Sequence, residues 1–496
     1  MGVWFARASE GRLRLGSLAL PCLLSALGVL AACGDEPKPA PKPPPEPVRA
    51  SIEELQNPKM CQSCHPKHYE EWSSSMHAYA ADDPVFIAMN KRGQRETNGQ
   101  MGEFCVQCHA PMAFRNGLTS DGLNLADLPY EAKGVTCYFC HNATGAGPTE
   151  VNADVDLAND QNMRGNLANA VDPGVHGVLR SEAHSSISMK SALLCGSCHD
   201  VKNQKGAHIE QTLLEYRNST SSIEKVGLMG GGDSCQGCHM KVVETDYVAQ
   251  LPPSSMPMLK KRSRHSHRFA AVDVALTEFP HREAQKLETE CALLNGAFIY
   301  LITTDRQGSF TVSIETNAGH NQPSGTSQDR RLWLEFIAYD ANDKVLFQSG
   351  VIGDGELEEY PIDDPKHDGQ LCMFRDKWQN ESGEEVHMFW EAVTRDTKGS
   401  LVVPLAKDSF INHVVDCSYR MPGRQQPARV AMRMRMRPVG VDVMSSLVES
   451  GDLDPSVVEA MPTFTLYNTV TEWRAGDPDV MDQKTIRLAP EPITCP

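Results

Sequence analysis

The sequence predicts a multidomain protein in which a mostly-α, loop-rich domain is followed by a C-terminal all-β, sandwich-like domain. Five copies of Cys-x-x-Cys-His lie between residues 61 and 239, in a stretch rich in Gly, Asn and Asp and poor in long helical patterns. After residue 290 the pattern changes to short alternating apolar segments separated by turn residues, which is typical of strands. We therefore expect domains at 51–275 and 290–490.

The spacing of the five motifs is the attachment signature of a c-type haem. Two thiols add to the haem vinyl groups, and the following His binds the iron as its proximal ligand. The motif residues are Cys61, Cys64 and His65; Cys105, Cys108 and His109; Cys137, Cys140 and His141; Cys195, Cys198 and His199; and Cys235, Cys238 and His239. The sequence thus predicts five covalently bound haem c groups.

Three other uses of paired cysteines explain this pattern less well. Zinc ribbons need no His after every second Cys. A thioredoxin-type dithiol usually occurs once, within a βαβ unit. Disulfides are common in exported proteins, but they leave the recurring His unexplained.

The N-terminus resembles the signal peptide of a bacterial lipoprotein. Three arginines precede an apolar run at 15–32, which is too short and too abruptly ended for a membrane span. The segment Leu30-Ala31-Ala32-Cys33-Gly34 resembles a lipobox, so we expect cleavage after residue 32 and a lipid anchor on Cys33; an ordinary signal peptide is the alternative. Residues 33–50 form a Pro-rich tether. These features predict a bacterial cell-envelope protein, anchored to the inner or outer membrane and facing the periplasm or the exterior.

The formal net charge of −17 argues against nucleic acid as a partner. The expected partners are other redox proteins or a quinol-linked membrane donor.

Helical spacing of aromatic residues predicts one helix from His65 to Tyr79. A second helix is expected at 443–449. Strands are predicted at 297–304, 310–315, 332–339, 344–348, 386–389, 411–419 and 430–437. The remaining cysteines, Cys291, Cys372, Cys417 and Cys495, suggest two disulfides with three possible connectivities, or else free thiols.

The sixth position of each iron separates a carrier from a catalyst. A second His closes the iron for outer-sphere electron transfer, whereas an open position can bind substrate. The candidate distal ligands are His77, His176, His184, His267 and His320. His320 lies on a loop of the predicted β domain, so as a ligand it would tie the two domains together.

Several segments resemble the cytochrome c-552/4 family of multihaem cytochromes over about residues 55–275. They include Cys61 to Pro66 with Tyr69 to Ala78, Gly134 to His141, Cys195 to Asp200, Glu215 to Ser219, Cys235 to Met240 and His267 to Phe269. The resemblance implies closely stacked haems with mostly bis-His ligation and a distal role for His77. Some members relay electrons, while related proteins oxidise hydroxylamine or reduce nitrogen and sulfur oxyanions.

These observations favour electron transfer by a lipid-anchored pentahaem cytochrome over catalysis. Pentahaem nitrite reductases resemble the chain in haem number, but they use a Cys-x-x-Cys-Lys motif that is absent here. Two alternatives stay open: an oxidoreductase with one open haem acting on a small nitrogen or sulfur oxyanion or a hydroxylamine-like substrate, and a subunit of a cell-envelope redox complex.

Overall fold

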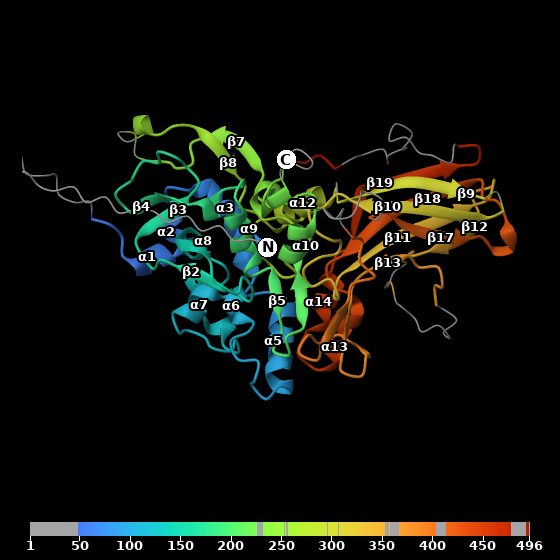
Figure 1. The fold of residues 1–496 in the computed structure, drawn as a ribbon, viewed down its shortest axis with the longest axis horizontal. Helices are drawn as coiled ribbons and strands as arrows, with labels where there is room; N and C mark the ends of the chain where they lie inside the picture. Colours follow the sequence, from blue (N-terminus) through green and yellow to red (C-terminus); the bar gives the residue numbers. More distant parts are fainter. Residues whose placement is uncertain are drawn as a thin grey trace, which may run out of the picture. The chain divides into compact units, whose positions relative to one another are not determined.

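Short helices joined by loops make up most of the chain before residue 282 (Figure 1). The protein is represented by a computed structural model, which describes residues 48–225, 232–251, 253, 256–294, 296–305, 307–352, 357, 367–402, 413–477 and 493–495. The proposed signal peptide and almost all of the tether, including Cys33, lie outside the described residues.

The helices of this region are short and often begin with Pro, whose fixed φ suits the first helical position. They are α1 (Ile52–Gln56), α2 (Pro58–Gln62), α3 (Pro66–Ser73), α4 (Met76–Tyr79), α5 (Pro84–Glu96), α6 (Val106–His109), α7 (Pro111–Arg115), α8 (Cys137–Asn142), α9 (Met189–Gly196), α10 (Thr212–Asn218) and α11 (Cys235–His239), with 3₁₀ turns at Leu125–Asp127, Tyr130–Ala132, Glu182–His184, Ile223–Lys225 and Met256–Met258.

The helix predicted from His65 to Tyr79 is divided into α3 and α4. Ser74 leaves the helical conformation, and the Ser75 side chain accepts a hydrogen bond from the Ala78 main-chain N–H. A serine that caps a new helix competes with continuation of the old one. The aromatic spacing therefore indicated the helical content of this segment but not its break.

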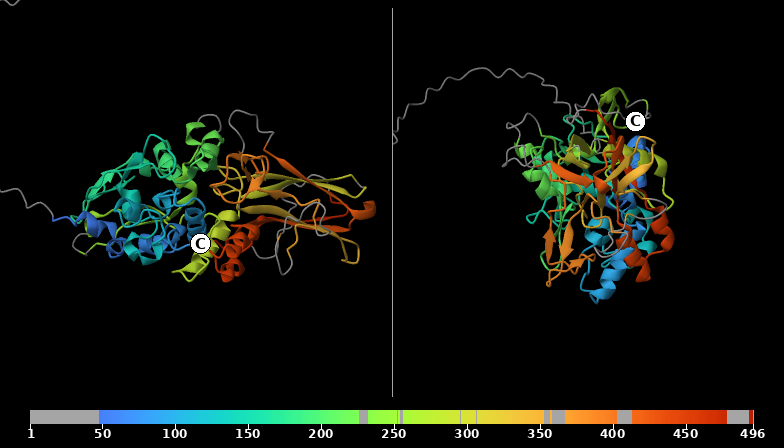
Figure 2. Two further views of the ribbon diagram at one scale, coloured as in Figure 1. Left: turned by 90° about the horizontal axis from the view of Figure 1, so that it is seen from below. Right: turned by 90° about the vertical axis from the view of Figure 1, so that its right-hand side faces the viewer.

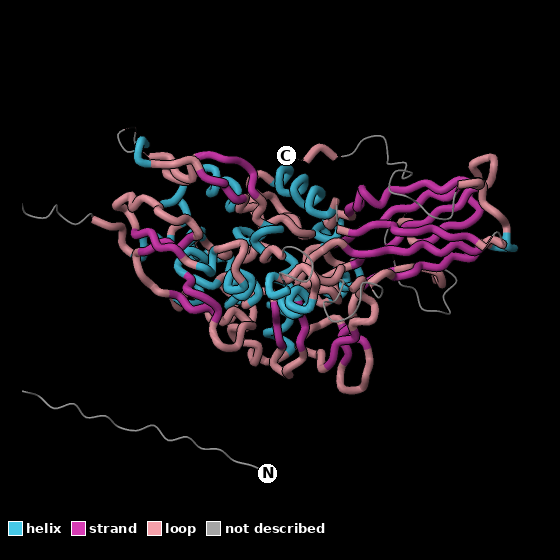
Figure 3. Tube along the Cα trace, turned by 45° about the horizontal axis from the view of Figure 1, so that its top comes forward, coloured by secondary structure: helices cyan, strands magenta, loops and turns pink. Residues whose placement is uncertain are grey.

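This region also contains four small two-stranded sheets. Figure 3 shows short strands among and beside the helices. Three are antiparallel, and the pair β3–β4 is parallel. Their strands are β1 (Ala143–Ala146), β2 (Val155–Leu157), β3 (Asn162–Gly165), β4 (Gly177–Arg180), β5 (Asp200–Lys202), β6 (His208–Gln211), β7 (Val242–Asp246) and β8 (Arg262–His265).

After helix α12 (Arg282–Leu293) the chain forms three antiparallel sheets (Figure 2). One has the order β17-β10-β9, the second has the order β12-β11-β18-β19 with β13 also paired to β11, and the third has the order β15-β14-β16. The strands are β9 (Ala297–Thr304), β10 (Ser309–Thr316), β11 (Arg331–Tyr339), β12 (Val345–Ser349), β13 (Met373–Phe374), β14 (Lys377–Gln379), β15 (Glu385–Val386), β16 (Thr394–Asp396), β17 (Val415–Arg420), β18 (Arg429–Arg437) and β19 (Phe464–Arg474).

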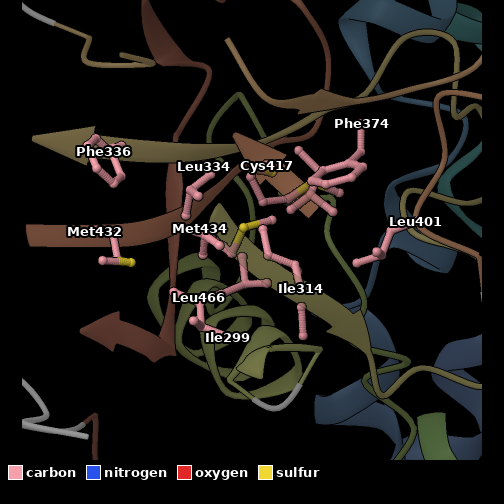
Figure 4. Close-up of a cluster of buried hydrophobic side chains, with 14 of the residues drawn as sticks. Ile299, Ile314, Leu334, Phe336, Phe374, Leu401, Cys417, Met432, Met434 and Leu466 are labelled. Carbon is pink, nitrogen blue, oxygen red and sulfur yellow. The ribbon is translucent and has the colours of Figure 1, made fainter. Parts of the chain in front are cut away.

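The first two of these sheets contribute side chains to one hydrophobic cluster (Figure 4). Strand β18 shows the cause, because its apolar residues alternate with arginines and the buried positions follow that alternation. On the other face, Arg433 and Arg435 donate to the Glu335 carboxylate of β11 at 2.7 and 3.0 Å. The strong alternation explains why this strand was predictable.

Most of the predicted strands appear within one or two residues of their expected ends. The strand expected at 386–389 is reduced to β15, because Met388, Phe389 and Trp390 are buried in a different cluster with Met101 and Ile209. The strand expected at 411–419 begins at Val415, and residues 411–412 lie outside the described part.

Later segments of the chain also pack against the helical region. Helices α13 (Val441–Glu449) and α14 (Pro455–Ala460) share a cluster with α5, in which Ala88, Met444 and Leu447 are fully buried. The β14–β16 sheet packs on β6 and on the loop after α5. The helical and β-rich regions therefore share these two hydrophobic clusters, and Val272 and Val274 also belong to the large cluster of the strands.

Two disulfides connect the four cysteines outside the motifs, Cys291 with Cys495 and Cys372 with Cys417. The first attaches the C-terminal segment to α12, and the second lies at the edge of the large cluster. No helix in the described ranges has both the length and the apolar character needed to cross a bilayer.

A substitution at Leu334 tests how much the large cluster contributes to the stability of the protein, because Leu334 is fully buried on central strand β11. We expect Leu334→Ala to lower the free energy of unfolding by about 2–5 kcal/mol, through lost burial and the cavity left behind. Val345→Ala, on neighbouring β12 at a side chain 43% exposed, should change it by less than about 0.5 kcal/mol. Urea unfolding followed by circular dichroism measures both, and equal losses would contradict the assignment of the core.

Candidate haem sites

Each Cys-x-x-Cys-His segment folds into one turn of helix. The His main-chain N–H bonds the carbonyl of the first Cys at 2.7 Å in His65, 3.1 Å in His109 and 3.2 Å in His199. Helices α8 and α11 begin at the first Cys of their motifs. Residues four apart in a helix lie on the same face. The local fold therefore suits attachment of one porphyrin to each motif.

Four of the motif histidines donate a hydrogen bond from Nδ1 to a main-chain carbonyl. Such a bond orients the ring and leaves Nε2 available as a metal ligand. The pairs are His65 with Val248 (2.7 Å), His109 with Ala80 (3.1 Å), His141 with Arg164 (2.6 Å) and His239 with Ala270 (3.0 Å).

Burial also keeps these imidazoles in the form that binds metal. It lowers the pKa of His109 to about 4 and that of His77 to about 3. Burial likewise lowers the pKa values of His141, His199 and His239. A neutral imidazole is the species that coordinates a metal, so these rings need no deprotonation near pH 7.

Three motif histidines face a second imidazole at a shared spacing. The ring centres are 6.3 Å apart in His199–His77, 6.2 Å in His141–His267 and 6.3 Å in His239–His320. An iron bound to two imidazole nitrogens, at about 2 Å from each, places the ring centres about 6 Å apart. The three pairs therefore have the geometry of bis-His haem sites.

The other two predicted distal ligands are arranged differently. His176 lies within electrostatic range of His65 and His141, and its Nδ1 donates to the Gly177 carbonyl at 3.0 Å. His184 stacks 5.4 Å from His141, closer than in the three pairs, and its Nε2 bonds the Cys140 carbonyl at 2.9 Å. His176 thus keeps Nε2 available, whereas His184 uses Nε2 to hold the third motif's backbone.

The second motif makes no ring contact with an imidazole. All 17 histidines lie in the described part of the chain; none of them makes a ring contact with His109, although His77 and His199 lie within electrostatic range of it. Its ring neighbour is Phe86 of α5, which stacks on it at 3.7 Å with an angle of 4° between the planes. This motif therefore lacks the imidazole pair found at the third, fourth and fifth motifs.

The position of His77 depends on a close approach of two backbone segments. The Val135 N–H donates to the His77 carbonyl at 2.8 Å. Gly134 has φ of +66°, and a Cβ at this position would lie 2.4 Å from the same carbonyl oxygen. Glycine at 134 is therefore required to bring the third motif beside α4.

The thiols of different motifs lie next to one another. Thiols close enough to influence one another's ionisation pair Cys61 with Cys137, Cys108 with Cys198 and Cys195 with Cys235. Cys140 is also within electrostatic range of Cys198. The attachment sites therefore form a connected series. With the motifs numbered 1 to 5 in chain order, motif 1 adjoins motif 3, and motif 4 adjoins motifs 2, 3 and 5.

Ionisable side chains surround the fourth motif. Arg330 donates two hydrogen bonds to the Asp273 carboxylate at 2.8 and 2.9 Å, and both residues act electrostatically on His199. Burial raises the pKa of nearby Glu210 to about 7, and Arg330 partly offsets this effect. A carboxyl group that titrates near neutrality beside the motif-2 and motif-4 cysteines can exchange a proton at physiological pH.

Sequence patterns gave no signal for several of these contacts. The carbonyl groups that orient the motif histidines belong to residues of no shared type, and Phe86 lies within an ordinary amphipathic helix. The pairing of each distal histidine is equally hidden, because the partners lie from 81 to 126 residues apart in the chain. Their residue type and their position outside the motifs made them candidates, and for His77 the family resemblance did so as well.

Comparisons with known proteins agree with this site. A family model described as "Cytochrome c554 and c-prime" matches residues 60–142, which contain the first three motifs. Among solved structures, a penta-heme cytochrome c552 from Thermochromatium tepidum has a similar fold, with a TM-score of 0.54 and 18% identity over 86% of this chain and 99% of that chain. No curated protein matches the chain. Residues 60–142 are therefore similar to a family of c-type cytochromes, and the chain has a fold similar to that of a penta-heme cytochrome; together with the five motifs and the facing imidazoles, these likenesses support covalent binding of haem c.

Proposed function

We propose that this cytochrome carries five haem c groups and transfers electrons between a membrane donor and another redox protein. The observation that carries the proposal is the spacing of 6.2–6.3 Å in three imidazole pairs. Iron closed by two histidines is low-spin and suited to outer-sphere electron transfer. In this assignment His77, His267 and His320 are the distal ligands of the motif-4, motif-3 and motif-5 haems, and His176 is that of the motif-1 haem.

The neighbouring thiols support a continuous path for the electrons. In the mature protein these sulfurs are thioethers at the porphyrin edges, so adjacent sulfurs imply adjacent haems. The contacts connect motif 1 to motif 3, motif 3 to motif 4, and motif 4 to motifs 2 and 5. Motif 4 is therefore the branch point of the proposed path.

Replacing a distal histidine should open one iron. We expect His320→Ala to convert one haem from low-spin to high-spin, because the motif-5 iron loses its second nitrogen. Electron paramagnetic resonance and magnetic circular dichroism of the oxidised protein count the two forms, and added imidazole should restore the low-spin signal.

His387→Ala is the matched control, since His387 lies in the same β-rich region and is 3.9 Å from the Asp442 carboxylate. Its spectrum should equal that of the unsubstituted protein. An unchanged low-spin count in His320→Ala would refute the ligand assignment, and an intact mass with fewer than five haems would refute the haem number.

The second motif supports a second candidate function, an oxidoreductase with one open haem. No imidazole makes a ring contact with His109, and Phe86 lies against its ring. An iron with an unfilled sixth position can bind a small molecule such as hydroxylamine or a nitrogen or sulfur oxyanion. Glu210, close to Cys108, would be a proton-exchanging group at this site.

Binding of a diatomic ligand separates the two functions. If the motif-2 iron is open, we expect the reduced protein to bind one carbon monoxide per molecule, seen as a partial change of the Soret band. His320→Ala should then bind two. A protein that binds no carbon monoxide and has five low-spin haems would exclude the oxidoreductase and leave electron transfer alone.

We also propose that a lipid on Cys33 anchors the protein to a bacterial membrane, facing the periplasm or the exterior. The lipobox-like sequence before Cys33 and the Pro-rich tether after it support this location. We further propose that the C-terminal module is a β-sandwich. The β17-β10-β9 sheet and the β12-β11-β18-β19 sheet share one hydrophobic cluster, which supports this proposal.

Cys33→Ala should move the protein from the membrane fraction to the soluble fraction, because the acceptor of the lipid is lost. Cys22→Ala is the control, since Cys22 follows Pro21 and lies outside the lipobox-like sequence. Fractionation in high salt followed by haem staining measures the distribution. Continued membrane attachment of Cys33→Ala would contradict the proposed anchor.

A further inference from the structure

Buried carboxylates hold the loops that carry two of the proposed distal histidines. Glu71 of α3 is 8% exposed, and its Oε2 accepts a hydrogen bond from the His267 main-chain N–H at 3.0 Å. Its Oε1 accepts a hydrogen bond from Nη1 of Arg264 at 2.7 Å, and Arg264 is 7% exposed. Each oxygen of Glu71 therefore has one partner, and the His267 loop is fixed to the helix that follows motif 1.

The same arrangement recurs at a second site with unrelated sequence. Oε2 of Glu215, on α10, accepts hydrogen bonds from the Asn321 main-chain N–H at 3.2 Å and from the Ser324 hydroxyl at 2.6 Å. Its Oε1 accepts from Nη2 of Arg395 at 3.2 Å. Glu215 thus fixes the loop that carries His320, and it shares with Asp376 the guanidinium of Arg395, whose side chain is 3% exposed.

These contacts have both a geometric and an electrostatic consequence. A carboxylate with both oxygens bonded holds its partners in one orientation. Its negative charge, in a region of low effective dielectric constant, also acts on a nearby iron more strongly than a solvated charge would. The positive charge of the arginine offsets most of the negative charge of the carboxylate. A nearby haem iron would therefore experience only the difference between these two charges.

Other charged groups around Glu71 are paired among themselves. Arg264 also donates to Glu244 at 2.7 Å, and Lys67 bonds Glu244 and Asp246 at 2.7 and 2.9 Å. From the remaining packed elements, Arg268 is 3.2 Å from the Glu288 carboxylate. Removing one charge from this set therefore leaves a net charge beside the His267 loop.

Helix α3 connects the His267 loop, which Glu71 holds, to motif 1. It begins directly after His65, and the His68 ring lies 5.8 Å from His65 and 4.8 Å from His267. The proximal ligand of one proposed haem and the distal ligand of the next are therefore held by one helix.

We propose that Glu71 and Glu215 are positioning residues, which fix the distal imidazoles of the motif-3 and motif-5 haems and, with Arg264 and Arg395, set the reduction potentials of those haems. This inference rests on His267 and His320 being distal ligands, as proposed above. Neither carboxylate binds iron, since each acts through the loop that carries the ligand.

The direction of each effect follows from charge. Reduction adds one electron to the haem, so a nearby positive charge stabilises the reduced form. Glu71→Gln keeps the side-chain shape but leaves Arg264 less compensated, and it should raise the potential of the motif-3 haem. Arg264→Gln removes the positive charge and should lower it.

The experiment is a potentiometric titration of the intact holoprotein, followed by magnetic circular dichroism. We expect Glu71→Gln and Arg264→Gln to change the electron affinity of one haem by about tenfold in opposite directions, which is about 59 mV for a one-electron couple. Glu215→Gln and Arg395→Gln should likewise change the electron affinity of the motif-5 haem in opposite directions. Because there are two variant pairs, the test does not depend on the folding of any one variant.

Glu70→Gln is the matched control, because Glu70 precedes Glu71 but its side chain is 54% exposed and 3.7 Å from Arg268. All five potentials should stay unchanged in this variant. Two results would overturn the proposal. One is a shift of the potential in the same direction in Glu71→Gln and Arg264→Gln, because a loosened loop would change the potential regardless of the sign of the lost charge. The other is no shift in either variant pair.

His267→Ala separates this proposal from the ligand assignment on which it rests. Loss of one low-spin haem in His267→Ala, with unchanged potentials in Glu71→Gln, would refute the positioning role alone. An unchanged low-spin count in His267→Ala would refute the ligation itself and the positioning role of Glu71 with it.

Discussion

An iron that binds two imidazoles fixes the distance between them, and the helical region holds three imidazole pairs at the spacing that the proposed haem irons would require. The motif supplies one imidazole by local helix geometry, but the other comes from a remote segment: His77 faces His199, His267 faces His141 and His320 faces His239. A ring spacing near 6 Å tolerates little error, because a nitrogen displaced by a few tenths of an ångström weakens its bond to the metal. The fold must therefore hold several loops rigidly, and hydrogen bonds to main-chain atoms do this more than hydrophobic packing does.

The distribution of the hydrophobic cores is consistent with this organisation. One large cluster fills the space between the strands of the C-terminal region, where strand alternation directs many of the side chains inward and α12 and neighbouring loops add others. The clusters near the motifs are smaller and are separated from one another. A porphyrin is itself a large apolar body, so short helices and loops around it need not meet in a common core. Buried serines and carboxylates in that region then have main-chain partners, as at Ser75 and Glu71.

Features determined by neighbouring residues were predictable from the sequence, and features determined by distant contacts were not. The five motifs and strands such as β9 and β18 follow from residues close together in the chain. Strand β19 escaped prediction because Thr469 and Thr471 occupy buried positions, where the Thr469 hydroxyl accepts from Met434 N–H and interrupts the regular register. The disulfide connectivity and the partner of each distal histidine depend on tertiary contacts alone. Composition could make His184 a candidate, but only the fold shows its Nε2 bonded to the Cys140 carbonyl.

The β-rich region contributes residues to the proposed haem sites as well as lying beside them. It supplies His320 opposite His239, Arg330 beside His199, and Arg395 to Glu215. Arg395 also bonds Asp376 and Ser327, so a single buried guanidinium joins β16, the strand-connecting loops and α10. Ion pairs buried this deeply contribute little net stability, because desolvation offsets their attraction. Breaking one leaves an uncompensated charge, however, and so they strongly disfavour alternative arrangements of the same loops. Such pairs are therefore better suited to fixing where His320 lies than to increasing the stability of the fold, and the distal ligand that we propose His320 to be would need that specificity.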